Sequence, residues 1–137
     1  DLDKLLMDPY CSVESDGVVT ATDGPLSNYT MNRSSFGYTI RFIEEYVINR
    51  KIFTLEEGIR KMTSLPADSA VLPNRGRIEP GKAADLVVLD KNNLTDNSTN
   101  EEPNAYPFGV ELVIVNGQVV LNDNLRTDIS PGCLVTQ

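Results

Sequence analysis

Hydrophobic residues recur at helical spacing between Phe36 and Lys51, and the charged residues of this segment fall mostly on its other side. The apolar stripe consists of Phe36, Ile40, Ile43 and Val47, widened by Phe42 and Tyr46. Spacings of three and four residues are typical of an amphipathic helix that covers a core. We therefore predict a helix over Phe36–Lys51.

A second helix is predicted directly afterwards. Thr54 is suited to cap its start, and Glu57, three residues later, would complete a capping box. The expected buried line of this helix consists of Leu55, Ile59 and Met62. Because proline cannot continue a helix, we expect Leu65-Pro66 to end it, and Pro66–Ala70 could begin one more short turn.

After Pro73 the pattern changes to short apolar runs. Pro80 presets φ for the first corner of a turn at Glu79–Lys82, and Gly81 accepts the positive φ of the second corner. The run Leu86–Leu89 that follows is too short for a helix. We interpret it as a strand with both faces covered.

Two further strands are predicted at Val110–Val115 and Gln118–Asn122. They flank Asn116-Gly117, which is the strongest short-range signal for a hairpin. The polar, Asn-rich segment Lys91–Tyr106 is expected to be a connecting loop. We predict no further element after Asn122.

Near the N-terminus, Tyr10–Ser15 is predicted to be a strand, and Asp16-Gly17 turns the chain at its end. The following segment, Val18–Ser35, contains Gly24-Pro25 and is expected to be a loop. A loop of this length is usually a functional lid or disordered.

The composition excludes several classes of partner. The net charge is −8, and there is no cluster of basic residues with which to neutralise nucleic-acid phosphates or to bind an anionic membrane surface. No apolar run approaches the ~18 residues of a membrane span, and no signal-peptide pattern opens the chain. We therefore expect no nucleic acid, no membrane and a cytoplasmic location.

The chain contains no histidine and two cysteines, Cys11 and Cys133. Zinc sites in proteins frequently use imidazole ligands, and this chain can supply none. Two cysteines are too few for a disulfide scaffold, and we expect small buried or half-buried side chains, although a bond between them is not excluded by the sequence.

The stretch from Arg75 to Asp90 contains Gly-x-Ile-x-x-Gly-x-x-Ala-Asp-Leu-Val-Val-Leu-Asp, which resembles the C-terminal signature of the amidohydrolase superfamily. Four other pieces resemble the D-aminoacylase branch, the N-acyl-D-amino-acid deacylases, in the same order. They are Ser15-Asp16-Gly17, Thr54–Ala67, Tyr106-Pro107 and Val113–Gly117. The resemblance extends over most of the chain from about Ser12 onward.

This resemblance implies an α/β fold in two parts. Residues 1–72 would be the last strand, a long loop and the last helices of a TIM-like (β/α)8 barrel. Residues 73–137 would be the C-terminal share of a small β-sandwich domain, including the 110–122 hairpin. A complete barrel needs roughly 250 residues, or at least about 200, so 137 residues cannot contain it. The chain is therefore expected to be the last portion of a longer protein.

Asp16 is the main candidate for chemistry. A carboxylate at the C-terminal end of a strand, followed by glycine, would point into the mouth of a barrel, where catalytic residues lie. Such a group can take a proton from water and pass one to a leaving amine. On the tripeptide alone, a turn or cap aspartate is the simpler interpretation. The resemblance implies the catalytic acid/base of a D-aminoacylase.

Arg33 is the second candidate. The resemblance implies an arginine, in a His-Pro-Arg-like triplet ahead of a Ser-aromatic-Gly, that binds the substrate's α-carboxylate through its two-pronged donor geometry. This chain has Asn32-Arg33-Ser34-Ser35-Phe36-Gly37, without the histidine and the proline. A solvated loop arginine is the alternative.

We therefore predict the C-terminal segment of a zinc-dependent amidohydrolase that hydrolyses N-acyl-D-amino acids, with the zinc ligands outside this chain. The segment would be inactive alone. It would associate with the remainder of the barrel or with a partner chain through exposed apolar faces of Phe36–Val47 and Leu55–Met62. The alternative is a non-catalytic amidohydrolase-like module or subunit used for assembly, in which the hairpin's edge strand pairs with another chain.

Overall fold

The computed structural model describes residues 1–29 and 31–135. Thr30, which belongs to the predicted loop Val18–Ser35, and residues 136–137 lie outside the described residues. The helical elements are α1 (Leu2–Leu6), the 3-10 turn η1 (Gly24–Leu26), α2 (Ser34–Phe42), the π-helical segment η2 (Ile43–Asn49), α3 (Leu55–Met62) and α4 (Ser64–Ser69). The strands are β1 (Leu86–Leu89), β2 (Val110–Val115), β3 (Gln118–Asn122) and β4 (Leu125–Arg126).

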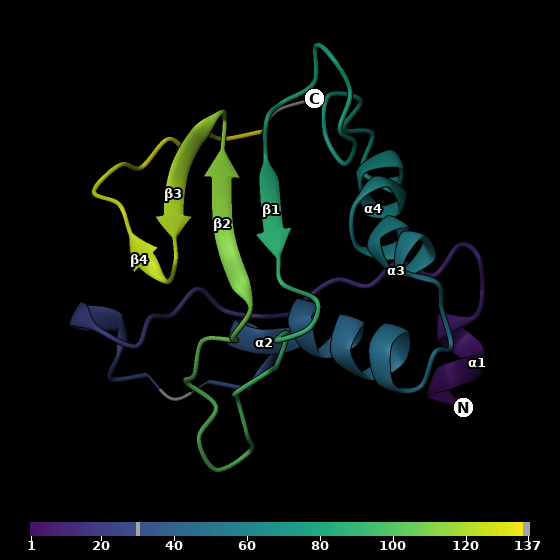
Figure 1. The fold of residues 1–137 in the computed structure, drawn as a ribbon, viewed down its shortest axis with the longest axis horizontal. Helices are drawn as coiled ribbons and strands as arrows, with labels where there is room; N and C mark the ends of the chain where they lie inside the picture. The colour runs from purple at the N-terminus through teal and green to yellow at the C-terminus, as the bar shows by residue number, and fades with distance from the viewer. Residues whose placement is uncertain (30, 136–137) are drawn as a thin grey trace.

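The strands form one antiparallel sheet in the order β1-β2-β3-β4. Figure 1 shows this sheet standing beside the pair α3 and α4, with α2 running below both. The chain therefore combines helices and a sheet in an α/β fold, as the sequence predicts.

The helix predicted over Phe36–Lys51 is confirmed, although it begins at Ser34 and continues beyond Phe42 as the π-helical segment η2. Three members of its apolar stripe are buried and form a core with Leu94: Ile40, Ile43 and Val47. Leu89 and Val110 pack against the same core. The stripe therefore joins the helix to the sheet, and it is not the exposed face that the sequence predicts.

The start of α3 is confirmed only in part. The Thr54 side chain accepts a hydrogen bond from the Glu57 N–H at 3.2 Å, as predicted. The reciprocal half of the capping box is wrong, because the Glu57 carboxylate instead accepts two bonds from Arg60, at 2.7 and 2.9 Å. Leu55 is exposed, so the predicted buried line is also wrong at that position.

Leu65-Pro66 does not end α3, which stops at Met62. Pro66 instead lies in the first turn of α4, where backbone N–H groups have no helical partner and a missing one costs nothing. The short extra turn of helix suggested near Pro66 is therefore confirmed, and it starts at Ser64.

The strand predicted at Tyr10–Ser15 is wrong, since this segment is irregular. Its one backbone bond to another element runs from the Val13 N–H to the Lys61 carbonyl, at 2.9 Å. A strand is stabilised by a ladder of bonds to a neighbouring strand, and no strand lies beside this segment among residues 1–29 and 31–135.

The predicted turns of the second half are confirmed. The Lys82 N–H donates to the Glu79 carbonyl at 3.2 Å, and Gly81 has a φ of 87°. Asn116 and Gly117 have φ values of 47° and 78°, the positive pair that a type I′ hairpin requires. The two-residue strand β4 follows the hairpin and was not predicted.

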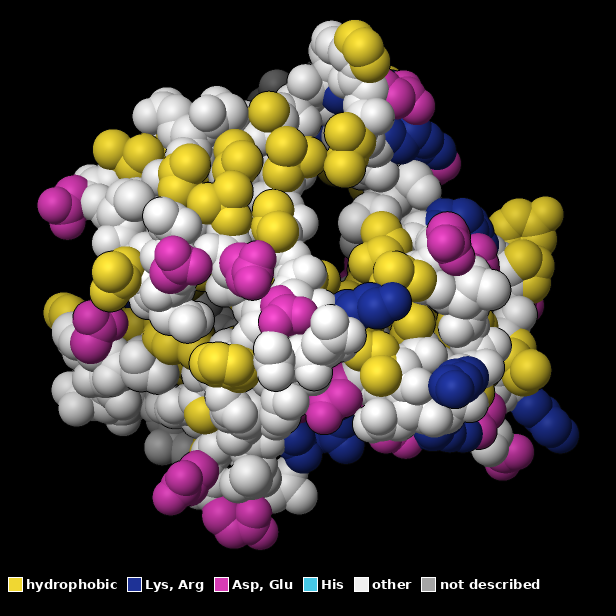
Figure 2. Space-filling view, in the orientation of Figure 1, with side chains coloured by type: hydrophobic (Ala, Val, Ile, Leu, Met, Phe, Trp, Pro, Cys, Tyr) yellow, Lys and Arg dark blue, Asp and Glu magenta, His cyan; other side chains and the backbone are white. Residues whose placement is uncertain are grey.

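Neither face of β1 is fully covered within the described residues, which corrects the prediction for Leu86–Leu89. Val87 is 57% exposed and Val88 is 45% exposed. Because consecutive strand residues point to opposite faces, each face of β1 carries one exposed valine. Figure 2 shows hydrophobic side chains gathered over β1, β2 and β3. The free edges of the sheet belong to β1 and β4, and the hairpin lies between them.

Across the part of the chain that the structure describes, no helix has both the length and the apolar character that crossing a membrane requires. Both cysteines are free thiols. Cys11 is half-buried, as expected, whereas Cys133 is exposed.

The end of α4 stores strain that a single substitution should release. The Leu72 N–H donates to the Ala67 carbonyl and the Val71 N–H to the Asp68 carbonyl, the bonding pattern of a Schellman motif. Val71 has the left-handed φ of 56° that this motif usually assigns to glycine. The left-handed conformation costs a side-chain-bearing residue about 1–2 kcal/mol, and the extra chain entropy of glycine offsets part of this.

Val71→Gly is therefore expected to raise the free energy of unfolding by up to about 1 kcal/mol, measured by chemical denaturation. Val71→Ala retains a Cβ atom and is the matched control, with a smaller change. Equal or lower stability of the glycine variant would contradict the strained conformation of Val71.

Candidate functional site

The Ser15–Gly17 segment lies against the first turn of α2. A Cβ atom on Gly17 would come within 2.9 Å of the Ser35 Cα, so a side chain at position 17 does not fit. The Val18 N–H donates to the Ser35 hydroxyl at 3.1 Å. These contacts place Asp16 beside the start of the helix.

Asp16 is exposed, and its carboxylate has no hydrogen bond or ion pair within the described residues. Most other acidic groups in this part of the chain have partners, such as Asp68 with Arg77 and Asp3 with Arg50. The Asp16 carboxylate is therefore open to solvent in the part of the chain that the structure describes.

Lys61 fixes the segment that leads to Asp16. Its side chain is 1% exposed, and its Nζ donates to the carbonyls of Asp8 at 2.7 Å and Cys11 at 3.0 Å. The ammonium group also lies 5.4 Å from the centre of the Phe53 ring. The sequence analysis missed this residue, because a lysine on a helix is usually a solvent-facing residue.

Glu57 lies next to this ammonium group on α3, with its Oε1 3.9 Å from Nζ of Lys61. The Arg60 guanidinium, which donates two hydrogen bonds to Glu57, holds the pKa of that carboxyl below its ordinary value. Arg60 also donates to the Pro9 carbonyl at 2.9 Å. Two neighbouring cations of α3 therefore bind the backbone of the N-terminal segment.

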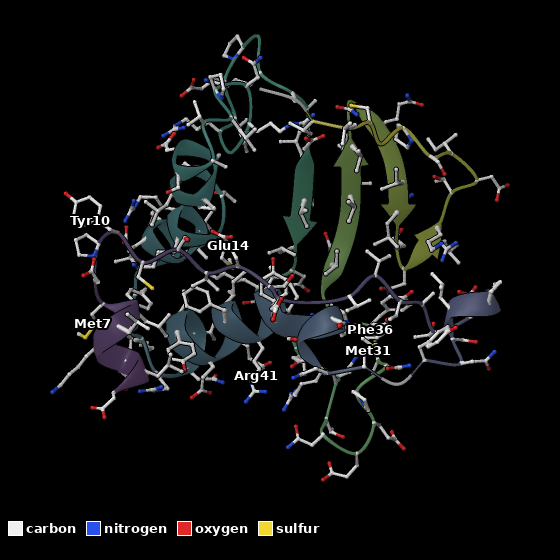
Figure 3. All side chains as sticks on the ribbon, turned by 180° about the vertical axis from the view of Figure 1, so that it is seen from behind. Met7, Tyr10, Glu14, Met31, Phe36 and Arg41 are labelled. Atoms are coloured by element: carbon white, nitrogen blue, oxygen red, sulfur yellow. The ribbon has the colours of Figure 1, made fainter. Side chains whose placement is uncertain are left out.

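Arg33 stands at the N-cap of α2, and its side chain bonds to Asp96. Its Nη2 donates to Asp96 Oδ2 at 2.8 Å, with the two side chains 25% and 3% exposed. Arg33 lines a cavity of about 290 Å³ together with Asn32, Ser34, Tyr38, Arg41, Phe42, Tyr46 and Asp96. Figure 3 shows Arg41 pointing from α2 away from the sheet.

The structure brings Asp16 and Arg33 to the same end of α2 but does not join them. No hydrogen bond or ion pair links the two side chains, both of which are described. Figure 3 shows Glu14 on the irregular segment that passes along the helix, and Phe36 at the helix start. The first turn of α2 is therefore the common support of both candidate residues.

Asp96 is a residue that sequence reasoning missed. Its Oδ1 accepts from the Ser98 N–H at 2.9 Å and from the Ser98 hydroxyl at 2.6 Å. A Cβ atom on Gly37 would overlap the Asp96 carboxylate, so the loop approaches α2 only because position 37 is glycine. The pattern Asp-x-Ser in the polar loop indicates a local turn, but not its contact with the helix.

No metal site is formed by the described part of the chain. Within residues 1–29 and 31–135, no group of three or more histidine, cysteine, aspartate or glutamate side chains could hold a metal ion. The donor set that a zinc site needs is therefore not assembled by these residues.

Comparison with known proteins identifies a family. Residues 8–121 match the amidohydrolase family. An N-acyl-D-glutamate deacylase from Alcaligenes xylosoxydans xylosoxydans is 34% identical over 117 residues, which are 85% of this chain and 22% of that relative. An N-acyl-D-aspartate deacylase from the same organism is 32% identical over 132 residues, 96% of this chain and 25% of the relative.

Solved structures give the same result. The crystal structure of a D-aminoacylase matches 72% of this chain and 21% of its own, with a TM-score of 0.69 and 35% identity. The structure of N-acyl-D-glutamate deacylase from Bordetella bronchiseptica, complexed with zinc and a phosphonate inhibitor, matches 87% of this chain and 24% of its own, with a TM-score of 0.76 and 32% identity. The chain spans about a fifth to a quarter of the length of these relatives.

The close approach of Asp96 to α2 predicts a sensitive position. In Gly37→Ala the new methyl group would occupy the position of the Asp96 carboxylate. The carboxylate would move away from α2, and its bond to Arg33 would break. We expect a loss of roughly 1–3 kcal/mol in the free energy of unfolding, measured by chemical denaturation.

Gly132→Ala is the matched control, since a Cβ atom there meets nothing within 4 Å and the residue is exposed. Its unfolding free energy should stay within about 0.5 kcal/mol of the unsubstituted chain. Equal stability of the two alanine variants would contradict the tight contact at Gly37.

Proposed function

Because this chain belongs to the amidohydrolase family, we propose that it forms part of an N-acyl-D-amino-acid deacylase. The reaction would hydrolyse the amide bond of an N-acyl-D-amino acid to a carboxylate and a free D-amino acid. Residues 1–72 would belong to a (β/α)8 barrel and residues 73–137 to its small β-domain, as the similarity to D-aminoacylases suggests.

In this proposal Asp16 is the general acid/base. Its carboxylate would accept a proton from the water that attacks the amide carbon, and would then deliver that proton to the nitrogen of the departing amine. The observation that carries the proposal is an exposed carboxylate without a partner among the described residues, on a segment fixed by Lys61 and by α2.

Arg33 would bind the α-carboxylate of the substrate. Its guanidinium has a buried Nε without a partner, its Nη2 is bound to Asp96, and its Nη1 has no partner within the described residues. An arginine held at one nitrogen presents its remaining donors in a fixed plane, which suits recognition of a carboxylate.

Zinc is present in the structure of a related deacylase. The described residues of this chain do not offer the ligand set, so we place any zinc ligands in other parts of the enzyme. The contribution that we propose for this chain is therefore limited to proton transfer at Asp16 and substrate binding at Arg33.

A non-catalytic assembly module is the second candidate. The observation that favours it is the free edge of β1, which carries the exposed residues Val87 and Val88. An exposed apolar edge strand can pair with a strand of another chain. The unpartnered Asp16 carboxylate favours the enzyme instead.

Asp16→Asn is expected to abolish turnover in the protein that carries this chain. Asparagine cannot take up the proton, and general acid/base groups typically contribute about 10²–10⁴ in rate. Because Asp16 makes no contact that asparagine would break, the free energy of unfolding should change by less than about 0.5 kcal/mol. The measurement is kcat on an N-acyl-D-glutamate, together with chemical denaturation.

Glu14→Gln is the matched control, since Glu14 is an exposed carboxylate on the same segment. Its kcat should remain close to that of the unsubstituted protein. Turnover by Asp16→Asn at the unsubstituted rate would overturn the role of Asp16.

The 137 residues alone are expected to be inactive with added zinc, because the described part of the chain forms no site for three metal-binding side chains. The measurement is amine release from an N-acyl-D-glutamate by the purified chain, compared with buffer containing the same zinc concentration. Release above that background would show that the chain assembles a working site without other segments.

A further inference from the structure

Asp96 makes contacts that the roles proposed so far do not use. Its side chain is 3% exposed, and both of its oxygens are occupied. Oδ2 accepts from Arg33 Nη2 at 2.8 Å, while Oδ1 accepts from the N–H and the hydroxyl of Ser98 at 2.9 and 2.6 Å. A carboxylate bonded at both oxygens cannot rotate, so it presents Oδ2 to Arg33 in one direction only.

The loop that carries Asp96 is also fixed on the helix. The Asp96 N–H donates to Glu44 Oε2 at 2.9 Å, and the carboxylate lies on Gly37. Arg33, Gly37 and Glu44 are four and seven residues apart, so they lie on one face of the continuous helix formed by α2 and η2. Asp96 therefore contacts this helix face at three residues, Arg33, Gly37 and Glu44.

These contacts limit the freedom of Arg33. A free arginine side chain samples many rotamers, and a substrate that binds it must freeze them. Here the helix start fixes one end of the side chain and Asp96 fixes Nη2 at the other. Arg33 lines the cavity of about 290 Å³ in this fixed arrangement.

We propose that Asp96 is a positioning residue that holds the Arg33 guanidinium ready for the substrate's carboxylate. The proposal rests on the proposed function, because it uses the role of Arg33 assigned there. Asp96 itself touches no reacting atom. It acts across the chain, from the loop before β2 onto the helix that follows Asp16.

The test is a double-mutant cycle with Asp96→Asn and Arg33→Met in the protein that carries this chain, with KM and kcat measured on an N-acyl-D-glutamate. Asp96→Asn should raise KM roughly 3- to 10-fold, the range for immobilising one flexible side chain, with kcat within about 2-fold. Arg33→Met should raise KM further. The double variant should be no worse than Arg33→Met, because Asp96 acts through Arg33.

Asp90→Asn is the matched control. Asp90 lies at the start of the same loop and accepts from the Asn92 N–H and the Asn93 side chain, with no bond to Arg33. Its KM should not change. If Asp96→Asn does not fold, Ser98→Ala is the second variant, and the loss of its hydroxyl bond to Oδ1 should give a smaller rise in KM.

An equal fall of kcat in Asp96→Asn, Arg33→Met and the double variant would overturn the proposal, and so would increases in KM that add in the double variant. Asp96 would then only stabilise its loop. Hydrogen exchange of the Ser98 amide gives a readout without substrate, and Asp96→Ala, which removes the Oδ1 acceptor, should speed it about 10-fold or more. Unchanged exchange would refute the hydrogen bond that Asp96 accepts from the Ser98 amide. A third outcome would combine the expected exchange result with no hydrolysis of the N-acyl-D-glutamate by the unsubstituted protein. It would overturn the proposed function, and with it the role of Asp96 in substrate binding.

Discussion

The buried ammonium group of Lys61 determines the path of the N-terminal segment. A charge that is 1% exposed needs acceptors, because an unpaired buried ion would destabilise the fold by several kcal/mol. The acceptors are the carbonyls of Asp8 and Cys11, so this stretch must lie on α3. Val13 then bonds to the backbone of Lys61, and Gly17 meets the start of α2. Asp16 is placed by these contacts and not by a strand.

The elements that sequence could predict are those whose causes are local. The helical stripe of Ile40, Ile43 and Val47 and the Asn116-Gly117 turn depend on neighbours a few residues away, and both are confirmed. The strand expected at Tyr10–Ser15 depends on a partner strand, which the described residues do not supply. Only the reciprocal half of the capping box at Thr54 is wrong, because Arg60, on the same helix, binds the Glu57 carboxylate.

In the candidate site, too, local motifs could be predicted from the sequence and long-range contacts could not. Asp16 and Arg33 were identified because their short motifs resemble those of a known family, and their catalytic and binding roles are still proposals. Their surroundings could not be predicted, since Lys61 binds carbonyls 53 and 50 residues away and Arg33 binds a carboxylate 63 residues away. Neither Lys61 nor Asp96 differs in sequence from an ordinary solvent-facing charge. Burial gives them their importance, and burial is a property of the assembled fold.

The long separation between Arg33 and Asp96 has a consequence for the order of folding. The entropy of loop closure disfavours contacts between residues 63 positions apart until much of the chain between them is compact. The neighbouring helices α3 and α4 and the β2–β3 hairpin can form from local contacts alone. We therefore expect Arg33 to pair with Asp96 only after these local elements have formed, and the cavity at α2 to become organised at that step.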